Sequence, residues 1–318
     1  AIKKLVNNNI VFVDGLTRVG KSMMNMLLAS LKDMTHPQFI VPLEQMLPMY
    51  STGEISKSAI KQLTIFWLNE NSYNYNLSRN LNFRVEDLTS IYNGNNEKIL
   101  LENLKKKDGD QAFNEIYDAK NIFQFQTHNF LSQYSVLKDL DLNASFIEMF
   151  RNPIDTIHSW YSRGWGRRFD EEDARSFTTL YKFNKKTIPY YALGVELEYI
   201  GLNEMEKCVF MHNHMLLKSL TEFSKLSSKE KEKFMIIKFE DVLLHPEKTL
   251  SKLAEFLNTE KSEYSDIAMK KARVPREINL QEREKKLHEI EHLVNNKNLL
   301  GQLKELTDGY ENSCYGLL

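Results

Sequence analysis

Short apolar runs alternate with stretches of helical periodicity along most of the chain. The runs at 10–13, 122–126, 145–150 and 234–238 read as strands. Helical patterns follow the first run, begin near Asp155 after the third, and extend from Pro246 to Leu257 after the fourth. Strands that alternate with helices favour a parallel sheet covered by helices. The pattern therefore predicts an α/β fold.

The remaining segments add helices to this predicted sheet. Residues of about 40–120 and 165–230 read as mostly helical insertions, and residues of about 276–318 as a charged helical tail. The charge run at 282–286 is typical of a solvated helix face. The sequence shows no internal repeat and no linker rich in Pro, Gly or Ser. We therefore expect one domain over residues 1–318.

Composition and charge exclude several classes of protein. Of the 318 residues, 42% are hydrophobic and 11% aromatic, which is enough for a packed core and excludes wholesale disorder. Lys and Arg total 42 and Asp and Glu total 43, so the formal net charge is -1. This balance gives no global field for nucleic acid or an anionic membrane. Any bound anion must therefore be held by a local cluster.

Cysteine content and hydropathy bear on the compartment. Cys208 and Cys314 are too few for a disulfide framework, which favours a reducing compartment. No apolar run approaches the roughly 20 residues of a membrane span, and the first residues lack the apolar stretch of a secretory signal. We expect a cytoplasmic protein with no integral membrane segment, although a chain trimmed of an anchor would look the same.

The first chemical signal is a glycine-containing loop after the first predicted strand. Residues 15–22 read Gly-Leu-Thr-Arg-Val-Gly-Lys-Ser, which fits G-x-x-x-x-G-K-S between a strand and a helix. The glycines let the backbone bend around an anion, and the backbone N–H groups and the helix N-terminus then face it. Arg18 and Lys21 add positive charge, and Ser22 adds a hydroxyl donor. The loop alone indicates a protein that binds phosphate groups.

The second signal follows the third predicted strand. That strand ends in Arg151, Pro153 stops the sheet ladder, and Asp155 is a suitable N-cap for the next helix. Ser159 then lies about one turn inside the helix, on the face toward Arg151. An Arg and a Ser that converge at a strand end make a second anion site. The alternative is an Arg151 that pairs with Asp155.

These motifs resemble those of the sulfotransferase family that uses 3'-phosphoadenosine 5'-phosphosulfate. Residues 15–22 resemble its 5'-phosphosulfate loop, and 151–161 resemble its 3'-phosphate segment, R-x-P-x-D-x-x-x-S-x-Y. Residues 236–242, continuing to Leu257, resemble its later strand-helix block. The resemblance implies a fold related to P-loop nucleotide kinases. It also implies transfer of a sulfuryl group to an acceptor hydroxyl or amine, release of 3'-phosphoadenosine 5'-phosphate, and no metal.

The resemblance also implies roles for the residues that bind the donor. Arg18 would contact the transferring sulfonate, with Lys21 sharing stabilisation of the leaving group. Arg151 and Ser159 would hold the 3'-phosphate, and Phe239 would lie beside the adenine. The full set of expected donor-binding residues is Gly15, Thr17, Arg18, Val19, Gly20, Lys21, Ser22, Met23, Arg151, Ser159, Phe239, Lys270, Lys271 and Arg273.

The expected catalytic base is His128. Residues 126–129 read Gln-Thr-His-Asn and resemble the K-T-H segment of the family, in which the His takes the proton of the acceptor. Histidine suits this role because its pKa lies near neutral pH. Glu44 and Glu148 are alternative bases, since some relatives use a carboxylate.

Basic stretches and aromatic residues supply further candidates. Lys270, Lys271 and Arg273 stand where the family has a late basic loop over the 3'-phosphate. Arg163 and Trp165 lie in a segment with flanking glycines that could form a lip at the acceptor mouth, where Glu44 is also a candidate for contact with the acceptor. Solvated charge and ordinary packing are the alternatives for these stretches. Cys208, His212 and His214 do not share one helical face, so we expect no metal site.

Two other functions fit parts of the sequence. The loop also suits a phosphotransferase or nucleotide hydrolase that uses ATP and magnesium. A nucleotide-binding regulatory protein without turnover is the third interpretation. For a sulfotransferase, the acceptor stays open among a saccharide, a lipid, a peptide tyrosine and a small metabolite. The sequence does not indicate an oligomeric state.

Overall fold

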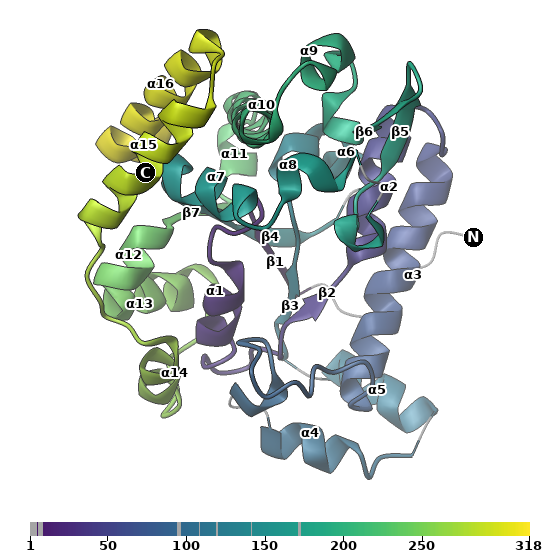
Figure 1. Ribbon diagram of the computed structural model, residues 1–318. Helices are drawn as coiled ribbons and strands as arrows, with labels where there is room; N and C mark the ends of the chain where they lie inside the picture. Colours follow the sequence, from purple (N-terminus) through teal and green to yellow (C-terminus); the bar gives the residue numbers. More distant parts are fainter. Residues whose placement is uncertain are drawn as a thin grey trace.

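A five-stranded parallel sheet forms the centre of the molecule (Figure 1). The computed structural model describes residues 5, 9–93, 97–107, 109–118, 120–140, 142–170 and 173–318. The sheet contains β1 (Ile10–Asp14), β2 (Gln38–Phe39), β3 (Phe123–Gln126), β4 (Ala144–Phe150) and β7 (Phe234–Lys238), in the order β2-β3-β1-β4-β7. Every neighbouring pair is parallel. The structure confirms the α/β fold predicted from the sequence.

The position of β1 decides where a ligand can bind. All five of its residues are buried, which explains why the strand reads as an uninterrupted apolar run. It lies between β3 and β4, and its last residue, Asp14, pairs in register with Glu148 of β4. The segments that follow these three strands therefore meet at one edge of the sheet. The carboxyl ends of strands are the usual binding edge of open α/β sheets.

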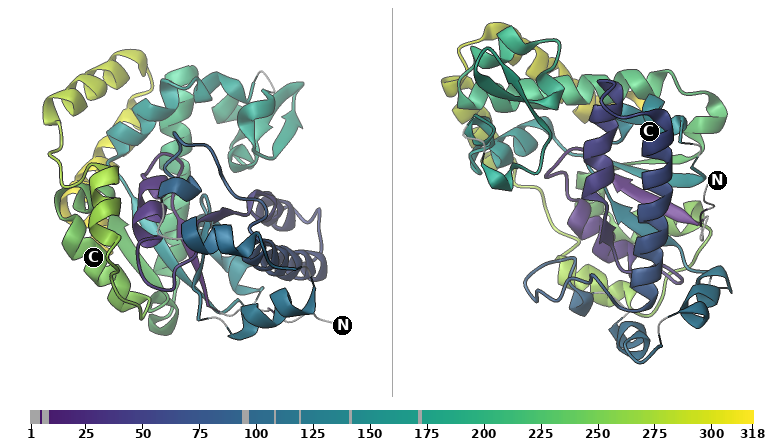
Figure 2. Two further views of the ribbon diagram at one scale, coloured as in Figure 1. Left: turned by 90° about the horizontal axis from the view of Figure 1, so that it is seen from below. Right: turned by 90° about the vertical axis from the view of Figure 1, so that its right-hand side faces the viewer.

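Helices flank the sheet (Figures 1 and 2). The elements next to it are α1 (Lys21–Leu28), η2 (Leu131–Gln133), α6 (Tyr134–Lys138), α7 (Pro153–Tyr161), α12 (Phe239–Leu244) and α13 (Pro246–Phe256). The helix expected from Pro246 is confirmed with its proline in the first turn, where the missing N–H costs nothing. Asn152, and not Asp155 as expected, caps α7: its side chain accepts a hydrogen bond from the backbone N–H of Ile154 at 3.0 Å.

The two insertions are only partly as expected. The first contains α2 (Val41–Ser51), α3 (Lys57–Asn76), η1 (Ile91–Asn93), α4 (Glu97–Asn103) and α5 (Asp110–Asp118). The second contains α8 (Trp165–Arg168), η3 (Ala174–Ser176), β5 (Leu180–Phe183), β6 (Lys186–Pro189), η4 (Tyr190–Ala192), α9 (Glu196–Ile200), α10 (Glu204–Ser224) and α11 (Ser228–Lys231). The second insertion is mostly helical as expected, but it also contains the antiparallel hairpin β5–β6. Its two-residue turn, Asn184–Lys185, has positive φ at both positions, as type I' turns require.

The last part of the chain returns to the edge of the sheet. It forms α14 (Ser265–Ala272), α15 (Leu280–Leu293), α16 (Lys297–Ser313) and η5 (Cys314–Gly316). Helices α15 and α16 both contact α7 and α10. Most of α15 is exposed, as the charge run predicts, but Arg283 and Ile290 face the protein. These contacts bring the last helices behind the helix that carries Ser159.

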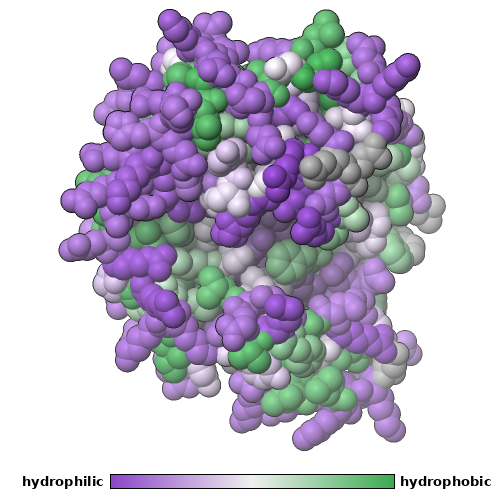
Figure 3. Space-filling view, in the orientation of Figure 1, coloured by the Kyte–Doolittle hydropathy of each residue, from purple (hydrophilic) through white to green (hydrophobic). Residues whose placement is uncertain are grey.

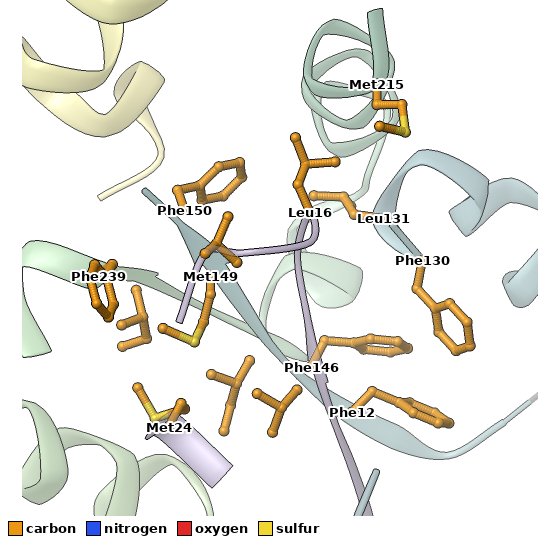
Figure 4. Close-up of a cluster of buried hydrophobic side chains, with 14 of the residues drawn as sticks. Phe12, Leu16, Met24, Phe130, Leu131, Phe146, Met149, Phe150, Met215 and Phe239 are labelled. Carbon is orange, nitrogen blue, oxygen red and sulfur yellow. The ribbon is translucent and has the colours of Figure 1, made fainter. Parts of the chain in front are cut away.

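The core continues from the sheet up to the loop after β1 (Figure 4). Phe12 of β1 packs against Phe146 of β4 with ring centroids 5.4 Å apart, and Phe146 stacks on Phe234 of β7 at 4.7 Å. Leu16 of the loop and Met149 of β4 are also buried. The loop is therefore supported from below by packed side chains.

The surface is mainly hydrophilic in the view of Figure 3, and it is hollowed near the middle of that face. No helix in the part of the chain that the structure describes is long and apolar enough to cross a membrane. Cys208 and Cys314 are both buried and free.

Candidate active site

Two glycines without a Cβ shape the backbone of the loop between β1 and α1. Gly15 and Gly20 have φ values of 125° and 99°. A Cβ at Gly15 would lie 2.3 Å from the carbonyl oxygen of Met149, and one at Gly20 would lie 2.2 Å from the ring of Phe239. No other residue fits either position without strain. Helix α1 begins directly after Gly20, so its free backbone N–H groups face the loop.

Lys21 is folded into this loop. Its Nζ donates hydrogen bonds to the carbonyl oxygens of Gly15 at 2.6 Å and Leu16 at 2.7 Å, and its side chain is buried. Burial lowers the pKa of Lys21 to about 8, although nearby carboxyl groups, chiefly Asp14, act in the opposite direction. The ammonium group is thus held by the backbone of the loop itself.

A pair of buried carboxyl groups lies beneath the loop. Burial, and after it the neighbouring Asp14, raise the pKa of Glu148 well above its usual value. Asp14 accepts hydrogen bonds from the Thr127 hydroxyl at 2.9 Å and from the Leu131 backbone N–H at 3.0 Å. Asp14 therefore fixes both ends of the segment that carries His128.

Two guanidinium groups contact Ser159, and a third, that of Arg151, is joined to them through Arg18. Arg18 Nε and Arg163 Nη1 donate to the Ser159 hydroxyl at 3.2 and 3.1 Å, and Arg151 Nη1 donates to the Arg18 carbonyl at 2.9 Å. Among the residues that the structure describes, no carboxylate forms an ion pair with any of the three, and the buried Nε of Arg151 has no partner. Burial, then Arg163 and Arg151, lower the pKa of Arg18. Such an excess of positive charge is suited to a multivalent anion.

Arg151 is available because Asp155 is bound elsewhere. Asp155 accepts from Arg283 at 2.9 and 3.0 Å and from Lys286 at 2.9 Å, both on α15. Glu240 of α12 also contacts Arg283, at 3.2 Å, and it accepts a hydrogen bond from the Tyr310 hydroxyl of α16. Asp155 and Arg151 therefore form no direct ion pair among the described residues, although Asp155 and Glu240 oppose the lowering of the Arg151 pKa by burial. This network, which we call the C-terminal clamp, joins α7 and α12 to the last two helices.

Phe239 lies against the loop. Its ring is 4.8 Å from the guanidinium of Arg151 and packs on Gly20. Only 7% of Phe239 is exposed, so its ring is enclosed in this conformation. Ser22 is 3.5 Å from the side-chain oxygen of Gln126, which also accepts from Asn25 at 2.6 Å.

Two of the expected base residues form one pair. Nδ1 of His128 lies 3.1 and 3.2 Å from the two carboxylate oxygens of Glu44, a residue of α2 that is 84 positions away in the sequence. The Glu44 side chain is 8% exposed and that of His128 is 31% exposed. An Nδ1–H that donates to Glu44 leaves Nε2 as the basic nitrogen. Glu148 lies apart from this pair, under the loop.

A cavity of about 280 Å³ opens beside this pair. Its polar lining includes Thr17, Glu44, His128, Asn129, Arg175 and Tyr190. Its apolar walls come from Leu16, Trp160, Trp165, Phe169, Tyr191, Met211 and Met215. Trp160 also donates to the Thr17 carbonyl at 2.9 Å, which ties the cavity wall to the loop. Asn129 stands in the 126–129 segment, but the sequence indicates no role for its own side chain, and Tyr190 is one of several aromatics that the sequence offers for stacking on a sugar or for packing.

The late basic residues are not brought to this cluster. Lys270, Lys271 and Arg273 are exposed at the end of α14, which begins beside Ser30 just past α1. Lys271 donates to the carbonyl oxygen of Tyr92 at 2.6 Å. Figure 1 shows α14 at the opposite end of α1 from α7. Arg163, expected at the acceptor mouth, takes the place beside Ser159 instead.

No group of three or more His, Cys, Asp or Glu in the described part of the chain could hold a metal ion. Cys208 and His212 are buried in α10, and burial raises the pKa of the Cys208 thiol to about 12 and lowers that of His212 to about 4.

Anion sites after two neighbouring strands of a parallel sheet are typical of an α/β protein that binds a ligand with two separated phosphate-like groups. A family model described as a sulfotransferase domain matches residues 17–292. This match spans most of the chain, and the protein belongs to the sulfotransferase family. A search of curated proteins finds no match.

Several solved structures are similar to this chain at low identity. A sulfotransferase from Alicyclobacillus acidocaldarius has 16% identity and a TM-score of 0.41, over 95% of this chain and 96% of that one. The sulfotransferase domain from the curacin biosynthetic pathway has 15% identity and a TM-score of 0.41, over 81% and 77%. A sulfotransferase from Mycobacterium avium has 10% identity and a TM-score of 0.41, over 92% and 78%.

Proposed function

We propose that this protein moves a sulfuryl group from 3'-phosphoadenosine 5'-phosphosulfate to a hydroxyl or amine of a small acceptor. The observation that carries the proposal is the relation among three features. A glycine loop follows β1, a cluster of arginines without a direct ion-pair partner follows β4, and the Glu44–His128 pair lines a cavity beside the loop. The family match supports sulfuryl transfer over phosphoryl transfer.

Each of the two anion sites binds one phosphate-containing group of the donor. The backbone N–H groups of residues 15–22 and the start of α1 suit the 5'-phosphosulfate. Arg151, Arg163 and Ser159 suit the 3'-phosphate, because two guanidinium groups and a hydroxyl can surround its oxygens. The unpartnered Nε of Arg151 fits this role. We therefore assign Arg163 to the binding of the sulfuryl donor and not to the mouth of the acceptor site.

Lys21 and Arg18 lie at the junction of these sites. When the donor binds, Lys21 exchanges the carbonyl oxygens of Gly15 and Leu16 for phosphate oxygens. Arg18 can move from Ser159 toward the sulfonate, since its side chain is exposed. Both cations then stabilise the negative charge that develops on the leaving 5'-phosphate.

The Glu44–His128 pair performs the proton transfer. Nε2 of His128 takes the proton of the acceptor hydroxyl while the acceptor oxygen forms a bond to sulfur. The bond between sulfur and the 5'-phosphate oxygen breaks, and its electron pair stays on the phosphate. Glu44 orients the imidazole and stabilises its protonated form. A positioned general base of this kind contributes about 10²- to 10⁴-fold to a rate.

Calorimetry with 3'-phosphoadenosine 5'-phosphate and with ATP–magnesium tests the proposal. We expect the bisphosphate to bind without metal and adenosine 5'-phosphate to bind at least about 100-fold more weakly, because it lacks the charge-assisted contacts of the 3'-phosphate. Tight binding of ATP that requires magnesium, with no binding of the bisphosphate, would favour a P-loop phosphotransferase instead. Bisphosphate binding without transfer to any acceptor would favour a regulatory protein.

A further inference from the structure

The charge run of residues 282–286 has no part in the proposed function, yet two of its side chains turn toward the donor site. Helix α15, which carries the run, lies beside α7 (Figure 1). Arg283 and Lys286 are one turn apart on the side of α15 that contacts α7, and only 12% of the Arg283 side chain is exposed. Buried cations are rare in proteins unless they are paired. These two side chains therefore have partners inside the protein.

Asp155 of α7 is the partner that the two cations share. Nε and Nη2 of Arg283 donate to its Oδ2 at 3.0 and 2.9 Å, and Nζ of Lys286 donates to its Oδ1 at 2.9 Å. Only 10% of the Asp155 side chain is exposed, so solvent screens these contacts little. Burial acts to raise the pKa of Asp155, but the hydrogen bond from Lys286 and two neighbouring guanidinium groups outweigh it and lower the pKa. Asp155 is therefore a carboxylate at neutral pH.

The guanidinium of Arg283 faces two further carboxylates. Its Nη2 lies 3.2 Å from Glu240 of α12, and its Nη1 lies 3.6 Å from Glu311 of α16. Each of its three nitrogens thus has a carboxylate oxygen within 3.6 Å. Because all three nitrogens face carboxylates, none is free to bind a phosphate group. Arg283 can act on a ligand only through the residues around it.

Arg151, which ends β4, is influenced by the same acids. Burial lowers its pKa, Asp155 and Glu240 oppose that shift, and Arg283 adds to it. Among the described residues, Arg151 nevertheless forms no ion pair with either acid, and its buried Nε has no partner. Its Nη1 donates to the Arg18 carbonyl in the loop at 2.9 Å. The two acids therefore lie close enough to act on Arg151, but their hydrogen bonds go to the last helices.

We propose, on the basis of the proposed function, that Arg283 and Lys286 are positioning residues that set the preference of the protein for a 3'-phosphorylated donor. They keep Asp155 from pairing with Arg151, and they offset its charge. Without them, Asp155 would either pair with Arg151 or repel the anionic 3'-phosphate. Both effects weaken binding of the 3'-phosphate, because like charges brought together cost affinity. The 5'-phosphate group binds at the separate loop of residues 15–22, so its contribution should change little.

The test compares adenosine 5'-phosphate with 3'-phosphoadenosine 5'-phosphate by calorimetry at one ionic strength. The ratio of their dissociation constants measures the preference for the 3'-phosphate. In Arg283→Gln we expect this ratio to fall by about fivefold or more, because residues of one ion-pair network are energetically coupled. Lys286→Gln should lower the ratio less, since Lys286 contacts only one of the acids. Lys285→Gln removes the same charge from an exposed position of α15 and is the matched control, with the wild-type ratio.

A second substitution separates this charge effect from a role in holding the helices together. In the double variant Arg283→Gln/Asp155→Asn, the carboxylate that needs compensation is gone. The ratio should then return to within about twofold of the wild type. Asp155→Asn alone should bind the bisphosphate at least as tightly as the wild type. A merely structural role of Arg283 would lower the free energy of unfolding in urea titration, and Asp155→Asn would not restore the ratio.

The outcomes separate this inference from the proposed function. If the wild type does not prefer the bisphosphate over adenosine 5'-phosphate, the proposed donor site fails and the inference fails with it. If the wild type has this preference, an unchanged ratio in Arg283→Gln, or one that Asp155→Asn does not restore, overturns only the positioning role. Loss of one partner from a buried ion pair strongly destabilises a protein. If Arg283→Gln does not fold, an unchanged ratio in Lys286→Gln or a lower ratio in Asp155→Asn overturns the inference.

Discussion

Replacement of Glu44 by Gln tests the role of the Glu44–His128 pair. Gln has nearly the same shape but no charge, so it removes the charge-assisted hydrogen bond to Nδ1 of His128. The two carboxylate oxygens lie 3.1 and 3.2 Å from Nδ1, and the Glu44 side chain is only 8% exposed, so solvent screens the contact little. Hydrogen bonds to charged groups contribute about 1.5–3 kcal/mol. At about 1.36 kcal/mol per factor of ten, kcat should fall by about 10- to 150-fold.

The His128→Ala variant sets the scale for this result. It removes the base itself, so kcat should fall by about 10²- to 10⁴-fold, while the affinity for the bisphosphate stays within about twofold of the wild type. Because Glu44 acts through His128, the double variant should be no slower than His128→Ala alone. The assay is the initial rate of sulfate transfer with saturating donor, with bisphosphate affinity measured in parallel by calorimetry.

Glu54→Gln is the control, because Glu54 is an exposed carboxylate that contacts Thr52 and Tyr181 and does not line the cavity. Its kcat should match that of the wild type. The reasoning is refuted if Glu44→Gln is slower than His128→Ala, or if the two losses multiply in the double variant. Either result would make Glu44 the base.

Three further predictions concern the donor site. Arg151→Ala should weaken binding of the bisphosphate by about 10- to 150-fold in calorimetry and leave the affinity for adenosine 5'-phosphate nearly unchanged. Arg163→Ala should lose less affinity, because Arg163 is exposed. Equal losses of affinity for both nucleotides would contradict a 3'-phosphate contact. The pKa of Lys21 is about 8 in the free protein, and a bound phosphate raises it. The affinity for the bisphosphate should therefore fall as the pH rises above 8, and calorimetry in buffers of different ionisation enthalpy should detect net proton uptake on binding. In Lys21→Arg this pH dependence should disappear. Gly20→Ala should lower the free energy of unfolding by at least about 1–2 kcal/mol in urea titration. The added Cβ would lie 2.2 Å from the Phe239 ring, and the φ of 99° is strained for alanine. An unchanged urea midpoint would show that the ring moves freely.

The central sheet could be predicted because its strands carry local signals. β1, β3, β4 and β7 are short apolar runs, and three of them are followed by a helix. β2 has two residues and no pattern of its own, so it was missed. The β5–β6 hairpin is half-exposed, and its turn at Asn184–Lys185 lacks the glycine that usually marks such a turn.

The candidate site likewise contains residues that local sequence predicts and residues that it does not. The loop of residues 15–22 and the pair Arg151 and Ser159 each lie within one strand-helix unit, where spacing decides geometry. The Glu44–His128 pair and the ion pair of Asp155 with Arg283 join residues 84 and 128 positions apart. No local pattern indicates such contacts, so the sequence alone predicts Asp155 as a helix cap.

The C-terminal clamp has a consequence for the order in which the protein is made. Tyr310 and Arg283 contact Glu240 and Asp155, and both acids act on the charge of Arg151, which we propose to bind the donor. A ribosome makes Gly15 early and Tyr310 late, so a partly synthesised chain can bury its first strands while Asp155 and Glu240 still lack their partners. β1 must also wait for β3 and β4, each more than 100 residues downstream, and such distant pairing slows folding. On the proposed function, we therefore expect nascent chains to bind the donor more weakly than the finished protein until α16 has docked.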